Sequence, residues 1–270
     1  MNIFQILLTQ PITNILVLFY NFFGNNLGIS VILTSLVLLI SVSPLSKSQM
    51  IAAKKMKEIQ PLIEKLKKKY KNDQKGLMSA QTELYKQKGI NPAAGCLPII
   101  PQIIILGIFA SVLSSTNLNI DKINSLLYSP LKFSEGSVLN THMLNVGNYV
   151  IDLAKPDILP ISGLPFKMPG ILLILGALAQ FISVKVMSPL VSAEKKVAEK
   201  TKSELDDAQL AVQSSMTYMF PLMTLWVGTS FSAGLALYFL VSSLFNTVRQ
   251  VKIQGWGGMT PFVQKIRLIK

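Results

Sequence analysis

Long apolar runs separated by lysine-rich polar segments form the main pattern of this chain. A helix needs about 20 apolar residues to cross a bilayer, and five runs approach that length. The pattern predicts an all-α polytopic membrane protein with five transmembrane helices, a cytoplasmic helical hairpin and an N-terminal interfacial helix. The expected segments are an interfacial helix at 1–25, spans at 26–48, 94–115, 169–187, 214–231 and 232–250, a hairpin at 49–93, an external loop at 116–168, a cytoplasmic helix at 188–213 and a basic tail at 251–270.

The N-terminal segment is apolar but interrupted by polar residues such as Gln5, Gln10 and Asn14. Its large apolar side chains share one helical face. We interpret it as a helix lying along the bilayer surface, with a further span as the alternative.

Two amphipathic stripes define the predicted hairpin. The first has apolar residues at three- and four-residue spacing from Met56 to Tyr70, and the second runs from Leu77 to Leu84. The polar stretch KNDQKG separates them, so two antiparallel helices are expected.

The other faces of the hairpin are basic, and we expect them to recruit partners. The candidate residues are Lys54, Lys57, Lys65, Lys67, Lys68 and Lys69. Anionic lipid headgroups, ribosomal RNA and a targeting protein would all suit such a face. A solvated surface that only sets topology is the simpler alternative. The helix at 188–213 has balanced charges and is expected to pack on the bundle as a connector.

Composition supports a membrane protein, because half of the 270 residues are hydrophobic and only 14% are charged. The net charge is +13, and 22 of the 26 basic residues fall in residues 47–93, in the 185–213 segment and in the tail from Arg249. The positive-inside rule then places these segments in the cytoplasm and the N-terminus outside, with the protein in the cytoplasmic (inner) membrane.

Catalytic and metal chemistry has little support in the sequence. Cys96 and His142 are each the single residue of their type, which excludes an intrachain disulfide and a cysteine cluster. Ion-coupled transporters usually have carboxylates within their spans. No Asp or Glu lies within a predicted span of this chain. We therefore expect no enzyme activity, no cofactor, no metal and no small-molecule substrate.

Polar residues inside the spans are the candidate site. Thr34, Leu38 and Ser41 share a face of the first span, and Thr224 adds a hydroxyl to the fourth. The candidate groove residues are Thr34, Leu38, Ser41, Gln102, Ser183, Thr217, Tyr218, Ser242 and Asn246. A shared, water-containing cavity would satisfy several of them, because an unpaired amide in hydrocarbon is costly. Packing between helices is the alternative for the small hydroxyl residues.

A methionine stripe marks the fourth span. Met216, Met219 and Met223 lie on one face, and Pro221 is expected to kink the same helix. Methionine adapts to irregular partners, so we expect the stripe to contact substrate. Ordinary core packing is the alternative.

Taken together, these motifs resemble the YidC family of membrane protein insertases, with its Oxa and Albino relatives. The resemblance is carried by LYKQKGINPAAGCLPIIPQ before the second span and by MTYMFPLMTLWVGTSFSAGLALYFLVSSLFNTVRQ over the last two. It implies a five-helix bundle with a groove open to the cytoplasm and lipid, closed outside, that works without nucleotide hydrolysis. Gln102 would face this groove.

Three positions depart from the family pattern. The family typically has an arginine in the first span, where this chain has Leu38 or Leu39. The proline that often follows the second-span glutamine is replaced within IIIL at 103–106, and Ser232 stands where proline is frequent. The missing arginine argues against a mechanism in which a buried positive charge attracts the acidic tails of substrates.

The leading hypothesis is a membrane protein insertase or chaperone. Nascent membrane proteins and membrane lipids are its expected partners, with the ribosome and the Sec translocon as further candidates. The alternative is a non-catalytic membrane scaffold or assembly chaperone that binds partner helices without moving their tails.

Overall fold

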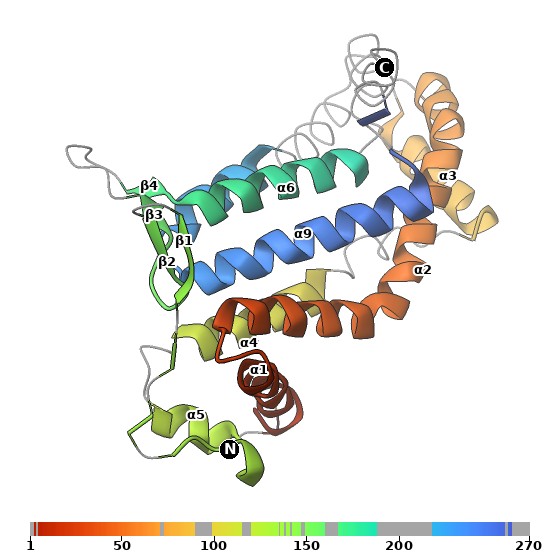
Figure 1. Ribbon diagram of the computed structural model, residues 1–270. Helices are drawn as coiled ribbons and strands as arrows, with labels where there is room; N and C mark the ends of the chain where they lie inside the picture. The colour runs from red at the N-terminus through yellow and green to blue at the C-terminus, as the bar shows by residue number, and fades with distance from the viewer. Residues whose placement is uncertain are drawn as a thin grey trace. The chain divides into compact units, whose positions relative to one another are not determined.

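The fold is mostly helical, in agreement with the predicted all-α class (Figure 1). The computed structural model describes residues 3, 5–70, 73–89, 99–114, 120–134, 136–137, 139–140, 142–146, 149–159, 167–187, 218–256 and 259–260. In chain order the elements are η1 (Gln5–Thr9), α1 (Gln10–Phe22), α2 (Leu27–Lys69), α3 (Gln74–Gln87), α4 (Ile99–Ser114), α5 (Ile120–Leu126), η3 (Ser129–Leu131), β1 (His142–Val146), β2 (Tyr149–Asp152), β3 (Ile158–Leu159), β4 (Met168–Pro169), α6 (Ile171–Met187), a helical segment at Tyr218–Gly228 and α9 (Ala233–Gln254). The predicted helix at 188–213 lies outside the described residues.

One stretch within the described residues is long and apolar enough to cross a membrane. It is Leu27–Pro44, with a mean hydropathy of 2.2 over 18 residues. Gln102–Leu113, Ile171–Val186 and Tyr218–Gly228 are also apolar helices but are shorter. The count of five spans therefore stays a prediction.

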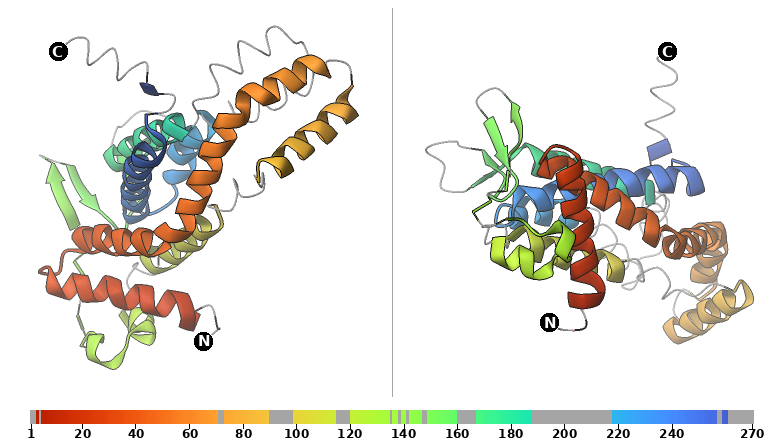
Figure 2. Two further views of the ribbon diagram at one scale, coloured as in Figure 1. Left: turned by 90° about the vertical axis from the view of Figure 1, so that its right-hand side faces the viewer. Right: turned by 60° about the horizontal axis from the view of Figure 1, so that its bottom comes forward.

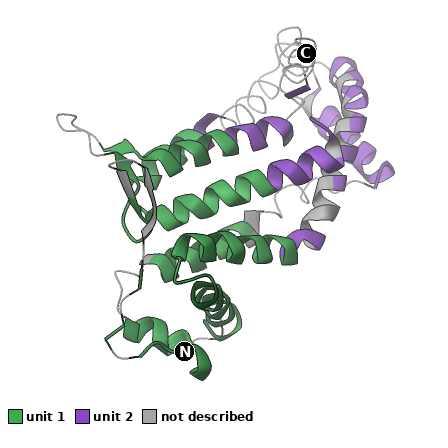
Figure 3. Cartoon of the chain, viewed as in Figure 1, with its two compact units in different colours: residues 1–41, 102–180, 221–245 green, residues 42–101, 181–220, 246–270 purple. Residues whose placement is uncertain are grey.

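The chain divides into two compact units, which are described separately (Figure 3). Unit 1 comprises residues 1–41, 102–180 and 221–245. Unit 2 comprises residues 42–101, 181–220 and 246–270.

The core of unit 1 is built on α4, α6 and α9. The ring of Phe109 on α4 stacks on Tyr238 of α9 at a centroid distance of 4.9 Å, and both side chains are fully buried. A Cβ added to Gly176 on α6 would lie 3.7 Å from the carbonyl oxygen of Ala236 on α9. The two helices thus approach closely at a small residue, as membrane helices often do.

Asn14 ties helix α1 to the loop expected at 116–168. Its amide nitrogen donates to the carbonyl oxygen of Leu126 at 2.9 Å, and its side-chain oxygen accepts from the backbone N–H of Tyr128 at 2.8 Å. The hydroxyl of Tyr20 accepts a further bond from the N–H of Asn140 at 2.7 Å. Two buried polar side chains therefore hold α1 to a segment far away in the sequence.

Helix α2 begins after a tight turn and continues past the predicted end of the first span. Gly24 and Asn25 have positive φ angles, which glycine and asparagine adopt most readily. The Asn26 side chain accepts from the N–H of Ile29 and caps the helix. Pro44 and Pro61 lie inside α2, so the span and the first basic segment form one continuous helix.

In unit 2, α3 folds back along the second half of α2 (Figure 2). The Asp73 carboxylate accepts from the N–H of Gly76 at 2.9 Å and caps α3. Ile59 and Ile63 on α2 are buried and pack against Leu84 and Tyr85 of α3.

The loop predicted at 116–168 contains short strands, which the sequence pattern did not indicate. Strand β1 pairs with β2 and β3 pairs with β4, in both cases antiparallel. The strands lead the chain from helix α5 to helix α6.

Candidate functional site: polar groups within the helices

A polar face runs along α9 within unit 1. Tyr238 and Ser242 are one turn apart, and both are buried. The half-buried side chain of Gln102 on α4 lies within electrostatic reach of the Tyr238 hydroxyl. That hydroxyl makes no hydrogen bond of ordinary geometry to the described residues. Two of the predicted groove residues, Gln102 and Ser242, thus belong to the surroundings of Tyr238, which sequence reasoning missed.

The first half of α2 carries a second set of polar side chains. Ser30 and Ser35 are buried and donate to carbonyl oxygens of their own helix. Thr34 is also fully buried, but its hydroxyl has no hydrogen-bond partner among the described residues. Leu38 is half-buried, whereas Ser41 is exposed and donates to the carbonyl oxygen of Val37. The face predicted from Thr34 to Ser41 therefore changes from buried to exposed.

A side-chain hydrogen bond links α6 to the Tyr218–Gly228 helix. The Thr224 hydroxyl donates to the side-chain oxygen of Gln180 at 2.7 Å. Thr224 was singled out from the sequence, whereas Gln180 was not. A polar residue inside an otherwise apolar helix is itself the clue that a partner is needed.

The part of α6 that belongs to unit 2 is also polar in places. Ser183 is buried, and the Lys185 ammonium lies 4.9 Å from the ring centroid of Phe181. The Phe181 ring in turn lies 5.9 Å from that of Tyr218, which is exposed. Aromatic rings attract cations at this distance, so Lys185 is held against apolar surface.

The end of α9 in unit 2 contacts α2 through Arg249. Its guanidinium donates to the carbonyl oxygen of Ser43 at 2.8 Å. Asn246, one turn earlier on α9, is half-buried. Arg249 was counted with the basic tail from the sequence, and no local pattern indicates its contact with Ser43.

The described part of the methionine stripe is exposed. Met219 and Met223 are 62% and 54% exposed, and Leu222 and Trp226 are exposed beside them. These side chains lie at three- and four-residue spacing and leave one helix face uncovered by the described residues. Met216 and Thr217, which were predicted for the stripe and the groove, lie outside the described residues.

The lysines predicted to recruit partners lie on the hairpin of unit 2. Lys54, Lys65, Lys68 and Lys69 are exposed, and Lys67 is half-buried. The Lys69 ammonium lies 5.4 Å from the ring centroid of Tyr70. The side chain of Lys57 lies outside the described residues.

A cleft of about 600 Å³ separates the two hairpin helices. Leu66 and Tyr70 line it from α2, and Ala80 and Leu84 line it from α3. Lys65 and Glu83 also lie on its wall. The described residues contain no group of three or more His, Cys, Asp or Glu side chains that could hold a metal ion.

The family model of the 60Kd inner membrane proteins matches residues 18–257 of the chain. This chain belongs to that family. The match includes α2, the hairpin, α4, α6 and α9, and therefore every polar group described above except those on the first part of α1.

Among the relatives of this chain, one from Fusobacterium nucleatum named membrane protein insertase YidC is 30% identical over 232 residues. That alignment covers 86% of this chain and 88% of the relative. A protein of the same name from Pelobacter propionicus is 28% identical over 249 residues, or 91% of this chain and 38% of the relative. A third protein of this name, from Geobacter sulfurreducens, is 27% identical over 247 residues. This alignment covers 92% of this chain and 37% of the relative. This chain thus spans less than two fifths of the latter two proteins.

The predicted first span has no basic residue between positions 27 and 46. Leu38 and Leu39 occupy the place where the resemblance led us to expect arginine, and Leu39 is buried. The buried polar side chains of this part of α2, which are Ser30, Thr34 and Ser35, are uncharged hydroxyls.

Proposed function

We propose that this chain is a membrane protein insertase. It takes transmembrane segments of nascent proteins into a polar groove that faces the cytoplasm, and it releases them sideways into the bilayer without nucleotide hydrolysis. The relatives named membrane protein insertase YidC support this assignment.

One observation carries the proposal: the fully buried hydroxyl of Thr34 has no hydrogen-bond partner among the described residues, and the buried hydroxyl of Tyr238 has only the Gln102 amide near it, without a hydrogen bond of ordinary geometry. An unpaired buried hydroxyl is unfavourable. Water or the polar tail of a substrate would supply the missing partner. Such groups shorten the apolar barrier that the tail must cross.

The free energy needed to move a polar tail across the bilayer is small enough that no nucleotide hydrolysis is required. A charged side chain at the centre of a membrane helix costs roughly 2.5–3.5 kcal/mol on insertion scales. Each hydrogen bond offered to the tail contributes about 1 kcal/mol. Two or three polar partners, together with burial of the substrate's apolar helix, therefore suffice.

The hairpin of α2 and α3 is proposed to recruit substrates or their carriers at the cytoplasmic side. Lys54, Lys65, Lys68 and Lys69 are exposed, and the cleft between the helices offers apolar side chains beside Lys65. Anionic lipid headgroups, ribosomal RNA and the Sec translocon would match this charge. Deleting residues 54–86 should stop insertion in a reconstituted assay, while the remaining protein still purifies as one species. Full insertion activity of the deleted chain would exclude recruitment.

Insertion of a single-span substrate with a short polar tail into proteoliposomes tests the groove. Thr34→Val and Tyr238→Phe keep the side-chain shape but remove one hydroxyl each, and each should slow insertion roughly fivefold, as expected for about 1 kcal/mol. Ser41→Ala is the control, because the Ser41 hydroxyl is exposed and bonds to its own helix. If the variant that combines Thr34→Val with Tyr238→Phe inserts the substrate at the wild-type rate, the proposed role of the polar groove is refuted.

The alternative function is a scaffold that binds partner helices without moving tails. The neutral first span favours it, since no buried cation draws the tail inward. A scaffold would cross-link to the substrate helix in the same proteoliposomes but would leave its tail accessible to added protease.

A further inference from the structure

A pocket of about 210 Å³ lies in unit 1, where the segment that follows β2 meets the start of α9. Its lining combines apolar side chains, two hydroxyl groups and one lysine, and none of the predicted groove residues belongs to it. Among the lining residues are Ala110, Lys155, Pro156, Ser230, Phe231 and Ser232.

Backbone hydrogen bonds fix the frame of this pocket. The N–H of Ala233, the first residue of α9, donates to the carbonyl oxygen of Lys155 at 2.7 Å. Two residues further along the chain, the buried Asp157 carboxylate accepts from the N–H of Leu173 at 2.8 Å and satisfies a donor at the start of α6. The backbone oxygen of Asp157 accepts from the N–H of Gly170, also at 2.8 Å. The side chain of Lys155 takes no part in these bonds, so it can be replaced without removing the frame.

The pocket lies at the depth where the apolar helices end. The helix Tyr218–Gly228 stops just before the pocket residues Ser230 and Phe231, and α9 begins just after them. Trp226 near the end of the first helix is 81% exposed. Tryptophan is enriched at the boundary between hydrocarbon and lipid headgroups. In a protein of an inner membrane family, the pocket is therefore at the level of the headgroups.

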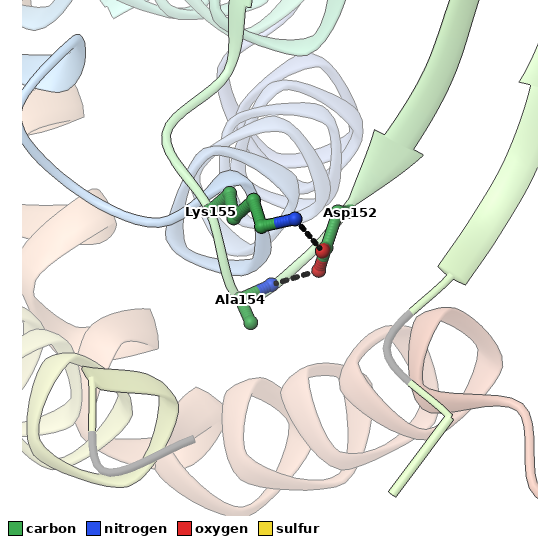
Figure 4. Close-up of polar contacts among 3 residues, drawn as sticks. All are labelled: Asp152, Ala154 and Lys155. Carbon is green, nitrogen blue, oxygen red and sulfur yellow. Dashed lines mark hydrogen bonds and ion pairs between the residues drawn. The ribbon is translucent and has the colours of Figure 1, made fainter. Parts of the chain in front are cut away.

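One cation and one anion lie side by side at this pocket (Figure 4). The Lys155 ammonium lies 3.2 Å from the Asp152 carboxylate, which also accepts from the N–H of Ala154 at 3.0 Å. The Lys155 side chain is 76% exposed, so the surrounding solvent and lipid reach its charge. An ammonium has three donors and a carboxylate about four acceptor sites, so their mutual contact leaves each able to bind a further group.

This arrangement favours a ligand that carries both charges. Asp152 offsets the charge of Lys155, which weakens the attraction for an anion alone. The N–H groups of Ala233 and Gly234 at the start of α9 already bind carbonyl oxygens and offer an anion nothing. A phosphate joined to an amine is complementary to the pair, and the Phe231 ring, which is 44% exposed, offers apolar surface beside it.

We propose that the pocket binds one zwitterionic phospholipid of the surrounding leaflet, with the chemistry of phosphatidylethanolamine. The Lys155 ammonium donates to the phosphate, and the Asp152 carboxylate accepts from the headgroup amine. The Phe231 ring contacts the apolar part of the lipid. This site goes beyond the proposed function, because it requires neither a substrate nor the groove.

Native mass spectrometry of the full chain in detergent tests the site, with phosphatidylethanolamine and phosphatidylglycerol added in equal amounts. Wild type should retain phosphatidylethanolamine in preference to phosphatidylglycerol, which has the phosphate without the amine. Lys155→Ala should weaken this retention roughly tenfold, because a charge-assisted hydrogen bond is lost. Lys132→Ala, at an exposed position of the same loop, is the control and should bind as wild type does. Equal retention by wild type and Lys155→Ala would overturn the proposal.

The charge of Asp152 should determine the choice of headgroup. Asp152→Asn keeps an acceptor for the N–H of Ala154 but removes the negative charge, so the preference should shift toward phosphatidylglycerol. If Asp152→Asn selects phosphatidylethanolamine as strongly as wild type does, the carboxylate does not bind the amine and the proposal is wrong.

Filling the pocket tests whether the lipid enters it. Ala110→Leu adds bulk to the wall that α4 contributes and should displace the lipid. Gly107→Leu adds bulk about one turn earlier on α4, at an exposed position where a Cβ meets open space, and should not. If both variants retain the lipid equally, the lipid lies outside the pocket and the proposal fails.

A soluble competitor separates a lipid from a free ion, and the readout separates this proposal from the insertase. Inorganic phosphate in large excess should leave the lipid bound, because it has neither the amine nor the apolar part; displacement by phosphate would show an anion site instead. A chain that inserts nothing but retains the lipid in the expected pattern would refute the insertase alone. Normal insertion without retained phosphatidylethanolamine would refute the lipid site alone.

Discussion

Thr224 donates a 2.7 Å hydrogen bond to Gln180 between two apolar helices. Both side chains are half-buried. In hydrocarbon each group would otherwise need another partner, so the bond fixes the two helices side by side at this level.

A double-mutant cycle should detect this bond. Gln180→Leu and Thr224→Val each remove one partner, and we expect a coupling free energy of about 0.6 kcal/mol, the usual size for hydrogen bonds between membrane helices. Reversible unfolding in detergent or bilayers measures it. Thr229→Val is the control partner, since the Thr229 hydroxyl bonds to its own helix at Trp226. The control cycle combines Gln180→Leu with Thr229→Val. If its coupling free energy equals that of the Gln180–Thr224 cycle, the hydrogen bond between Gln180 and Thr224 is absent.

Asn14 should be a stability centre of the N-terminal region. It is 4% exposed and bonds to Leu126 and Tyr128. Asn14→Ala leaves two backbone groups without their partner, which costs about 1–3 kcal/mol per buried group. The thermal midpoint should fall, and amide exchange should increase at Tyr128. Asn21→Ala, at an exposed position of the same helix, is the control and should change neither measurement.

These two contacts show where sequence reasoning succeeds and where it stops. Apolar runs and the KNDQKG break predicted helices near the positions of α2, α3, α4, α6 and α9, because burial imposes a local period. The partners of Asn14 lie 112 and 114 residues away, and no local pattern encodes such a pair. For the same reason Asn14 was interpreted only as an interruption of an interfacial helix.

Two further features could not be predicted from the sequence, for physical reasons. The predicted boundary at residue 48 rested on a change from apolar to basic residues, but helix formation depends on backbone hydrogen bonds, and α2 continues through Pro44. Asp157 was not singled out from the sequence, because its role depends on Gly170 and Leu173, which the pairing of β3 with β4 brings to it. Thr217, which was predicted for the groove, and Met216, which was predicted for the methionine stripe, stay predictions, because both lie outside the described residues.

The hairpin core should depend on Ile63. This side chain is 6% exposed and belongs to the cluster with Leu84 and Tyr85. Ile63→Ala removes three buried carbon atoms, and such truncations cost about 2–5 kcal/mol. Hydrogen exchange should then become faster throughout α3. Leu62→Ala, at a neighbouring position that is 37% exposed, should have a much smaller effect. Equal protection of α3 in both variants would contradict packing between the two helices.

Topology should follow the charge asymmetry of 22 basic residues against four. We expect Lys68 in the cytoplasm and Asn140 outside. Both side chains are exposed, so Lys68→Cys and Asn140→Cys, each in a Cys96→Ser background, should react with a membrane-impermeant thiol reagent from opposite sides of sealed vesicles. Labelling of both positions from the same side would refute the predicted orientation.

The charge of the groove should determine which substrate tails are favoured. Leu38 replaces the expected arginine, and it lies one turn from the buried hydroxyl of Thr34 on α2. Lys185 is held over the ring of Phe181, and in the predicted topology it lies near the cytoplasmic end of its span, where it can snorkel to water. It would attract an acidic tail to the mouth of the groove but not hold it deeper. Wild-type protein should therefore discriminate weakly between neutral and acidic tails.

Leu38→Arg should increase the preference for acidic tails, because it places a cation beside Thr34. The measurement compares insertion of matched single-span substrates whose tails differ by one or two aspartates. Lys185→Ala is run in parallel and should remove only the weak preference of the wild type. If the wild type strongly favours acidic tails and keeps that preference after Lys185→Ala, another cation attracts the tail. Arg249, which reaches the backbone of Ser43 on α2, would then be the first residue to replace, and a neutral groove would be the wrong description of this protein.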